Sequence, residues 1–208
     1  MTKDPDLSAA YALTGPEDAK ALYRSWAATY DADFGDAQGY RLPMEVARAY
    51  VAAGGVGPVL DVGAGTGVVA KGLSSAGIEP IDAVDLSEEM LKIAGKKSLY
   101  RALIPADVTQ PVDLPGTPYA GVVSAGTFTL GHLGPGALLP IFDLAASGAL
   151  FVISVNAAHF TSAGFEGFLS DHADRIATLR TEDVRIYTDK ADADHRDSIA
   201  RLLIFRLI

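Results

Sequence analysis

The feature that most constrains the fold is a regular alternation of apolar and helix-like segments from residue 58 to the C-terminus. Five strand-length segments are apolar on both faces, which is typical of a parallel sheet covered by helices on both sides. The segments between them have helical patterns. The expected strands span 58–64, 80–86, 100–107, 119–126 and 148–156, and the expected helices span 67–77, 87–97, 134–147 and 164–179.

Two further strands are expected at the end of the chain. Residues 182–190 and 198–208 are joined by the polar loop 191–197, which predicts a hairpin at the edge of the sheet. We therefore predict an α/β, doubly wound Rossmann-like fold with a seven-stranded sheet. The sheet is expected to be mostly parallel, with one antiparallel edge strand and helices on both faces.

The segment before the sheet has a helical pattern. Leu22, Trp26 and Tyr30 recur at a spacing of four, which places them on one face of a helix. A second helix is expected to start at Pro43 and to end before Gly54. The 208 residues suit one domain, 1–208, with a mobile tail at 1–14, a helical lid at 15–55 and an α/β core at 56–208.

Composition limits the partners. Lys and Arg number 17 against 26 Asp and Glu, a formal net charge of −9, so we expect no nucleic-acid partner. The absence of cysteine excludes disulfides and thiolate chemistry. The N-terminus lacks a signal-peptide pattern and the apolar stretches are too short to span a membrane, which predicts a cytoplasmic protein with no membrane partner. The oligomeric state is not defined by the sequence.

A glycine-rich loop follows the first expected strand, in "VLDVGAGTGVVAKGL" (59–73). Ligands of open α/β sheets bind at the carboxyl ends of the strands, and glycines there permit positive φ and close approach. The third glycine, Gly67, comes one residue too early for the dinucleotide pattern G-x-G-x-x-G. Asp61 before the loop disfavours a pyrophosphate and suits a cationic ligand. Asp85, at the end of the second strand, suits a ribose diol.

At this point the chain resembles the class I S-adenosylmethionine-dependent methyltransferases. The matching motifs are "VLDVGAGTG", "IDAVDLSEEML" and "PADVTQ", in the order and spacing of that family. The resemblance implies S-adenosyl-L-methionine as cofactor. Asp61 would lie near its ammonium group and Asp85 would hold its ribose hydroxyls. The other implied cofactor residues are Gly63, Ala64 and Gly65 at the methionine portion, Leu86, Met90, Asp107 and Val108 at the adenine, and Ser124 and Gly126 in the last part of the fourth strand.

Three of these assignments compete with structural roles. Asp107 also suits a cap at the end of a strand. Leu86 and Met90 equally suit the packing of a helix against the core.

Two more stretches resemble small-molecule members of the family, including the Williams–Beuren-region methyltransferase-like proteins. They are "YRSWAATYDADF" near the N-terminus and "SAGTFTLGHLGP" after the fourth strand. The resemblance implies that Tyr23, Trp26 and Tyr30 belong to a lid over the methionine end of the cofactor. An aromatic stripe at helical spacing equally suits the core.

Methyl transfer from a sulfonium requires alignment of donor and acceptor and exclusion of water. His132 is the leading candidate for a general base, because imidazole titrates near neutral pH. A hydrogen bond to a loop carbonyl is the competing role, and His159 is a second candidate. Phe128, Phe160, Phe165 and Phe168 are expected to give the acceptor site an apolar character, which favours a small organic acceptor. No residue cluster has metal-ligand spacing, so no metal is expected.

Two other functions stay open. An NAD(P)-binding oxidoreductase is disfavoured by the glycine spacing and by the lack of a Tyr-x-x-x-Lys pair. A module that binds S-adenosylmethionine without turnover would carry the same cofactor motifs. An apolar acceptor cavity beside the sulfonium would favour the enzyme.

Overall fold

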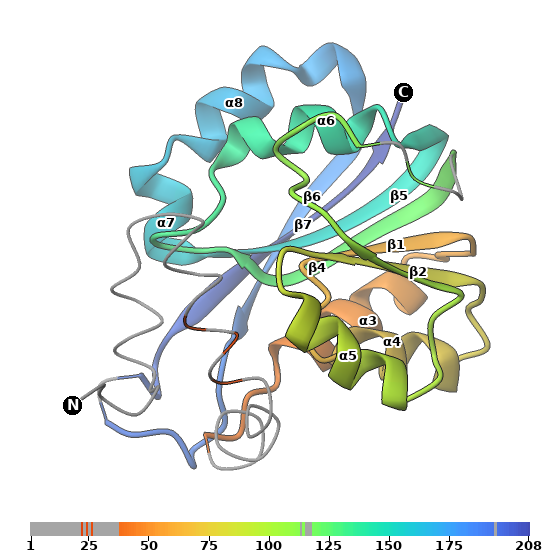
Figure 1. Ribbon diagram of the computed structural model, residues 1–208. Coiled ribbons are helices and arrows are strands. Elements are labelled where there is room, and N and C mark those ends of the chain that lie inside the picture. Colours follow the sequence, from red (N-terminus) through yellow and green to blue (C-terminus); the bar gives the residue numbers. More distant parts are fainter. Residues whose placement is uncertain are drawn as a thin grey trace.

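The computed structural model describes residues 22, 24, 26, 38–112, 114, 118–193 and 195–208, and its centre is a seven-stranded sheet (Figure 1). The strand order is β3-β2-β1-β4-β5-β7-β6, and only β7 runs antiparallel to its neighbours. The strands are β1 (Val59–Val62), β2 (Ile81–Asp85), β3 (Ala102–Pro105), β4 (Tyr119–Phe128), β5 (Ala145–Asn156), β6 (Ile176–Arg185) and β7 (Ile199–Leu207).

The predicted fold class is confirmed, including the closing hairpin of β6 and β7. The structure also shows where the antiparallel strand lies. The chain crosses from β5 to the outermost position, which β6 occupies, and returns as β7 between β5 and β6. The antiparallel strand therefore lies one place inside the edge, paired on both sides.

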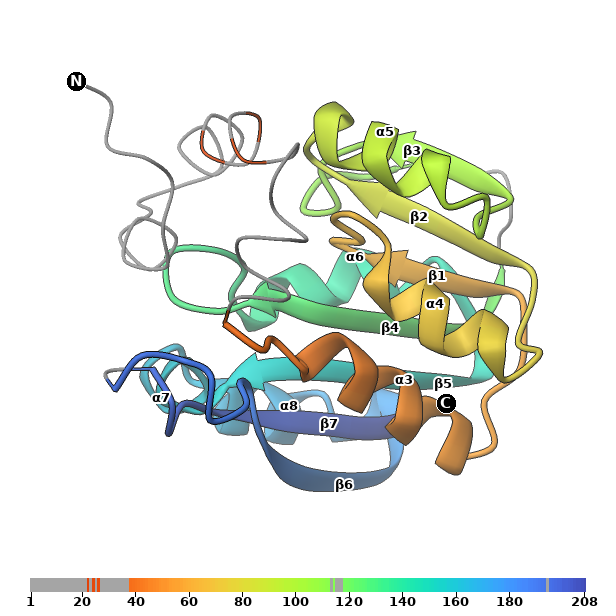
Figure 2. The same cartoon turned by 90° about the horizontal axis from the view of Figure 1, so that it is seen from below.

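Helices cover both faces of the sheet (Figures 1 and 2). One layer holds α3, α4 and α5, and the other holds α6, α7 and α8. Neighbouring residues of one strand point into opposite layers, as Val59 and Leu60 do. The helices are α3 (Leu42–Ala52), α4 (Val68–Ser75), α5 (Glu88–Lys96), α6 (Leu138–Phe142), α7 (Ala157–Ser162) and α8 (Phe165–Asp171), with 3-10 turns at Pro135–Ala137 and Ala173–Arg175.

The helix expected from Pro43 is α3, and it packs directly on the sheet. Its buried residues Val46 and Tyr50 join the core cluster that also contains Val59 and Val123. Tyr50 lies where any side chain on Gly121 would be, since an ideal Cβ there falls 1.7 Å from its hydroxyl oxygen. The close approach of α3 to β4 therefore depends on this glycine.

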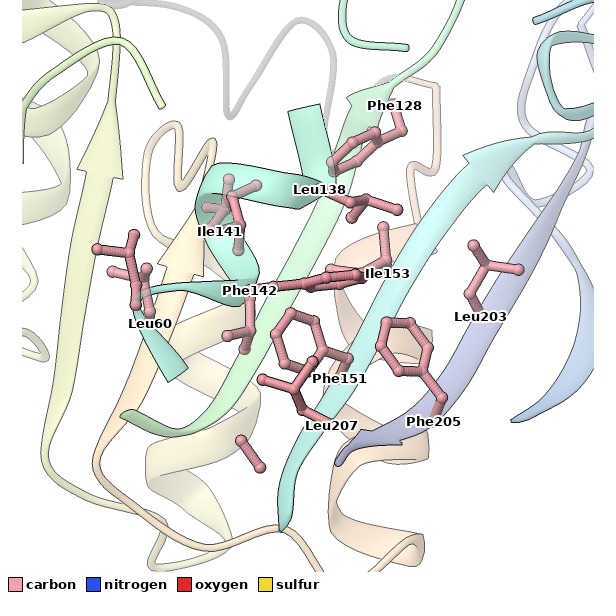
Figure 3. Packing of buried hydrophobic residues seen from close by; sticks show 14 of the residues in the cluster. Leu60, Phe128, Leu138, Ile141, Phe142, Phe151, Ile153, Leu203, Phe205 and Leu207 are labelled. Atoms are coloured by element: carbon pink, nitrogen blue, oxygen red, sulfur yellow. The ribbon is translucent and has the colours of Figure 1, made fainter. Parts of the chain in front are cut away.

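The opposite layer is rich in phenylalanine (Figure 3). Phe151 and Phe205 stack across β5 and β7 with ring centroids 4.9 Å apart, and Phe142 of α6 meets both rings edge-on. Phe128 and Phe165 are fully buried in the same cluster and contact each other edge-to-face. The expectation that these last two line an acceptor site is therefore wrong, because they fill the core.

Two regions differ from the sequence predictions in their element boundaries. The helix expected over 134–147 ends at Phe142, and the one expected over 164–179 ends at Asp171. In both places the next strand begins earlier than expected, because Ala145 pairs with Tyr119 and Ile176 pairs with Leu207. Pairing with a neighbouring strand overrides the local pattern there.

Helix α7 was not predicted, although its N-terminal signal is present in the sequence. Asn156 caps the helix, since its side-chain oxygen accepts from the amides of Ala158 and His159 at 3.0 and 3.2 Å.

A buried carboxylate ties three strands of the sheet together. Asp82 of β2 is fully buried and accepts from Arg101 Nε at 2.9 Å and from the Tyr119 hydroxyl at 2.8 Å. Arg101 also donates through Nη2, so the guanidinium holds the carboxylate with two bonds. These contacts join β2 to the residue before β3 and to the first residue of β4.

Candidate active site

The glycine loop links β1 to α4 at the carboxyl edge of the sheet. Gly63, Gly65 and Gly67 all have positive φ, at +66°, +54° and +87°. An ideal Cβ on Gly63 would lie 2.0 Å from Thr127 Oγ1, so this glycine lets β4 approach the loop. An ideal Cβ on Gly65 has no neighbour within 4 Å among the described residues. Gly65 is thus the part of the loop that faces open space.

Asp85 closes the loop from the end of β2. Its Oδ2 accepts from the Gly65 amide and its Oδ1 from the Ser87 amide, both at 2.8 Å. Burial raises the pKa of Asp85, and these amide bonds act against that rise. Each carboxylate oxygen has two lone pairs, so each can accept one further hydrogen bond from a ligand hydroxyl.

Asp61 lies in the middle of β1 with no exposed surface. Its Oδ2 accepts from the Tyr100 hydroxyl at 2.7 Å, while its Oδ1 has no hydrogen-bond partner among the described residues. Burial raises the pKa of Asp61 to about 7, with a smaller contribution from the charge of Asp85. An ionised carboxylate with an unpartnered buried oxygen is costly unless a cationic ligand completes it.

Among the residues expected at the adenine, Asp107 makes hydrogen bonds that fit its competing structural role. Asp107 Oδ1 accepts from the Thr109 amide at 2.9 Å and from its hydroxyl at 2.7 Å, which is a local turn. Met90 and Val108 are buried, and Leu86 is half-buried. Ser87 caps the N-terminus of α5, since its Oγ accepts from the Met90 amide at 3.3 Å. Adenine contacts by these residues stay predictions.

Within β4, Ser124 is fully buried and donates to the Val62 carbonyl at 2.7 Å. Its hydroxyl is therefore engaged inside the sheet. Gly126 has a φ of +80°, and an ideal Cβ there would lie 2.5 Å from the Tyr40 hydroxyl oxygen. Tyr40 is a residue of this edge that the sequence analysis missed, because nothing local marks its approach to Gly126.

Tyr40 belongs to a short segment that is fastened to the β6–β7 hairpin. The Arg41 amide donates to the Ile186 carbonyl at 3.0 Å, and the Thr188 amide donates to the Gly39 carbonyl at 2.9 Å. The rings of Tyr40 and Tyr187 lie 5.7 Å apart. Residues 39–41 thus lie beside the hairpin at the carboxyl end of β6.

Among the three aromatic residues expected in the lid, the structure describes Trp26. This side chain is 2% exposed and belongs to the core cluster around α3, which fits the competing core role. Tyr23 and Tyr30 lie outside the described residues.

Two histidines hydrogen-bond backbone carbonyls of the loop that follows β4. His132 Nδ1 contacts the Leu130 carbonyl at 3.1 Å, and burial lowers the pKa of its imidazole. The carbonyl contact identified as the competing role is therefore present, and it assigns the hydrogen to Nδ1. His159 Nε2 donates to the Leu133 carbonyl at 2.9 Å, which fastens α7 to the loop that carries His132. Phe160 stacks on Phe165 and lies under Arg201, and Phe168 stacks on His172.

The described part of the chain contains no group of three or more His, Asp or Glu side chains placed to hold a metal ion. Among the same residues, no helix has the length and apolar character needed to cross a bilayer.

These residues fit S-adenosylmethionine better than a dinucleotide. The loop is flanked by two carboxylates, the buried Asp61 and the half-buried Asp85, which would repel a pyrophosphate. The unpartnered oxygen of Asp61 suits the ammonium group, and the remaining lone pairs of Asp85 suit a ribose diol.

Comparison with known proteins agrees with this geometry. Residues 59–148 match the family described as "Methyltransferase domain". A search of curated protein sequences finds no match.

Several solved structures share the fold. The magnesium protoporphyrin IX methyltransferase ChlM from Synechocystis PCC 6803 with bound SAM aligns with a TM-score of 0.63 and 18% identity, over 94% of this chain and 98% of that one. The methyltransferase CcbJ from Streptomyces caelestis aligns at 0.61 and 20% identity, over 88% and 96%. The N-methyltransferase NodS from Bradyrhizobium japonicum WM9 in complex with S-adenosyl-L-homocysteine aligns at 0.59 and 16%, over 79% and 85%. Residues 59–148 thus match a methyltransferase domain, and the chain shares the fold of class I S-adenosylmethionine-dependent methyltransferases.

Proposed function

We propose that the enzyme transfers the methyl group of S-adenosylmethionine to a small organic acceptor at the carboxyl edge of β1, β2 and β4. The observation that carries the donor site is Asp61, whose buried Oδ1 has no partner among the described residues. This oxygen would accept from the ammonium of the methionine portion, while Asp85 would accept from the ribose hydroxyls. Gly65 would leave room for the methionine portion.

The net charge of the chain supports a small-molecule acceptor over a nucleic acid. The chain carries a formal net charge of −9, which disfavours nucleic-acid acceptors. A cytoplasmic location stays a prediction of the sequence, testable by cell fractionation.

The protein's task in the reaction is alignment. When bound, S-adenosylmethionine would supply a methyl group on a positively charged sulfur; the carbon–sulfur bond breaks as the acceptor atom bonds to the methyl carbon, and the sulfur leaves as a neutral thioether. Asp61 and Asp85 would fix both ends of the donor, so that the acceptor meets the methyl group in line. The lid contacts of Tyr23, Trp26 and Tyr30 remain part of the proposal, supported by the attachment of residues 38–41 at this edge.

His132 would act as the general base for an acceptor that carries a proton. A neutral imidazole that donates through Nδ1 has its lone pair on Nε2, and the lowered pKa keeps the ring neutral at physiological pH. We expect His132→Asn to lower kcat about 100-fold with an unchanged affinity for S-adenosylhomocysteine. A variant with unchanged kcat would remove His132 from the mechanism.

The acceptor class can be tested with donor labelled in the methyl group. A cell extract is separated into a fraction below 1 kDa, a protein fraction and a nucleic-acid fraction, and each is incubated with the enzyme, with Asp85→Ala as control. We expect label in the small-molecule fraction with the wild type alone. Enzyme-dependent label in protein or nucleic acid instead would overturn the acceptor class.

A further inference from the structure

Tyr100 is a site-adjacent residue for which the sequence motifs give no role. It lies in the connection between α5 and β3, and its hydroxyl donates to Asp61 Oδ2 at 2.7 Å. The ring packs against the cluster of Ala64, Ala83 and Leu91, beneath the glycine loop. An ideal Cβ on Gly67 would lie 2.8 Å from Tyr100 Cε2, so the glycine at the start of α4 gives this ring its place.

This bond makes the two oxygens of Asp61 unequal. Oδ2 is occupied by a phenol, which can only donate to an ionised carboxylate, and Oδ1 has no partner among the described residues. A bond to one oxygen restricts rotation of the carboxyl group and stabilises its charged form. Both effects prepare the other oxygen for a cation.

We propose that Tyr100 is a positioning residue for the methyl donor, which holds Asp61 ionised with Oδ1 available to the ammonium group. The proposal rests on the proposed role of Asp61 in donor binding. It assigns to Tyr100 no contact with the donor itself.

The groups around Asp61 raise or lower the pKa of its carboxyl group. Burial and the charge of Asp85 both raise the pKa of Asp61, and the hydrogen bond from Tyr100 lowers it. On the helices packed above, Lys71, Glu88, Lys92 and Lys96 are solvent-exposed. Glu89 pairs with Arg24. Among the described residues, Tyr100 is therefore the group that favours the charged form of Asp61.

The expected consequence is a pH dependence of donor binding. The ammonium pairs with ionised Asp61, so affinity for S-adenosylhomocysteine falls as pH drops through the pKa of Asp61, by about tenfold per pH unit. Loss of a hydrogen bond to a charged group raises the midpoint by about one pH unit. The ligand's own amino group titrates equally in every variant.

The experiment is calorimetric titration with S-adenosylhomocysteine from pH 5.5 to 8.5. Tyr100→Phe is compared with wild type and with Tyr119→Phe, a matched control that removes a hydrogen bond of 2.8 Å to the other buried carboxylate, Asp82. We expect the midpoint to rise by about one unit in Tyr100→Phe alone. Equal midpoints in all three proteins would overturn the proposal.

The Asp61→Asn variant distinguishes an incorrect role for Tyr100 from an incorrect donor site. The proposal expects its binding to be weak and independent of pH. If Asp61→Asn binds as wild type does, the role of Asp61 is wrong and the proposal falls with it. A wild-type protein that binds no S-adenosylhomocysteine would overturn the donor site itself.

A second variant retains the aromatic ring at position 100 and changes only the strength of its hydrogen bond. Site-specific 3-fluorotyrosine at position 100 is a stronger hydrogen-bond donor, so the midpoint is expected to fall below that of wild type. A carbon-13 carboxyl titration of the ligand-free protein should report the same order for Asp61: fluorotyrosine lowest, wild type next, Tyr100→Phe highest. Any other order contradicts the proposal.

Discussion

The sheet contains two buried aspartates on neighbouring strands, each bonded to a tyrosine, with different surroundings. Asp82 of β2 accepts from Tyr119 and is also held by the Arg101 guanidinium. Asp61 of β1 accepts from Tyr100 and has no cationic partner among the described residues. The two side chains leave opposite faces of the sheet, since Leu60 and Val84, on the face of Asp82, pack in the phenylalanine-rich layer.

The difference distinguishes a structural carboxylate from one prepared for a ligand. A buried charge is tolerated when its partners are supplied by the protein, as they are at Asp82. At Asp61 the protein supplies a single donor, so part of the compensation is left to the bound ligand. The site is therefore expected to be less stable than it would be with a neutral residue there, as is common where function opposes stability.

The largest expected effect on stability comes from Asp61→Asn. The pKa of Asp61 is raised to about 7 in the folded state, above its ordinary value of 3.8, so the folded protein binds the proton more tightly than the unfolded one. Its favourable contribution is complete below about pH 4 and is lost as pH rises to about 7. At pH 8, Asp61→Asn should raise the free energy of unfolding of the ligand-free protein by a few kcal/mol.

Urea unfolding of both proteins between pH 4 and 8 measures this. The difference should grow with pH up to about 7 and then level off. A difference that shrinks with rising pH would mean that the charged form of Asp61 is already compensated in the ligand-free protein.

Asp82→Asn is expected to act in the opposite direction. It removes the charge that Arg101 pairs with, and since the Arg101 side chain is 43% exposed, part of the loss is recovered from water. We expect a decrease of about 1–3 kcal/mol in the free energy of unfolding at pH 8. Affinity for S-adenosylhomocysteine should be unchanged where the variant is folded. A stabilised Asp82→Asn would break the contrast between the two aspartates.

Tyr119→Phe should have the smallest effect. It removes one hydrogen bond from a carboxylate that keeps its guanidinium partner, so a decrease of about 1 kcal/mol is expected. Thermal unfolding at pH 8 gives the measurement. A decrease as large as that of Asp82→Asn would assign the stabilising role of the network to the tyrosine.

The sequence predicted the parts of this molecule that are local. The apolar strands, the glycine loop and Asp85 at the end of β2 all follow from residues close together in the chain. The alternation also predicted the closing hairpin, because two apolar segments flank a short polar loop.

The parts that escaped prediction depend on distant residues. Tyr100 and Asp61 are 39 positions apart, and Tyr119 and Asp82 are 37 apart, so neither hydrogen bond leaves a local pattern. The cofactor role of Ser124 stays a prediction, and the bond from its hydroxyl to the Val62 carbonyl of β1 leaves no local pattern either. Phe128 and Phe165 were assigned to an acceptor site because the sequence does not define which layer closes over them.

The most direct test titrates S-adenosylhomocysteine and NAD⁺ at pH 8 into wild type, Asp61→Asn and Asp82→Asn. We expect wild type and Asp82→Asn to bind S-adenosylhomocysteine equally, Asp61→Asn to bind it about 100-fold more weakly, and NAD⁺ not to bind. Equal binding by the two variants, or binding of NAD⁺ in its place, would contradict the claim that Asp61 is the carboxylate prepared for the methyl donor.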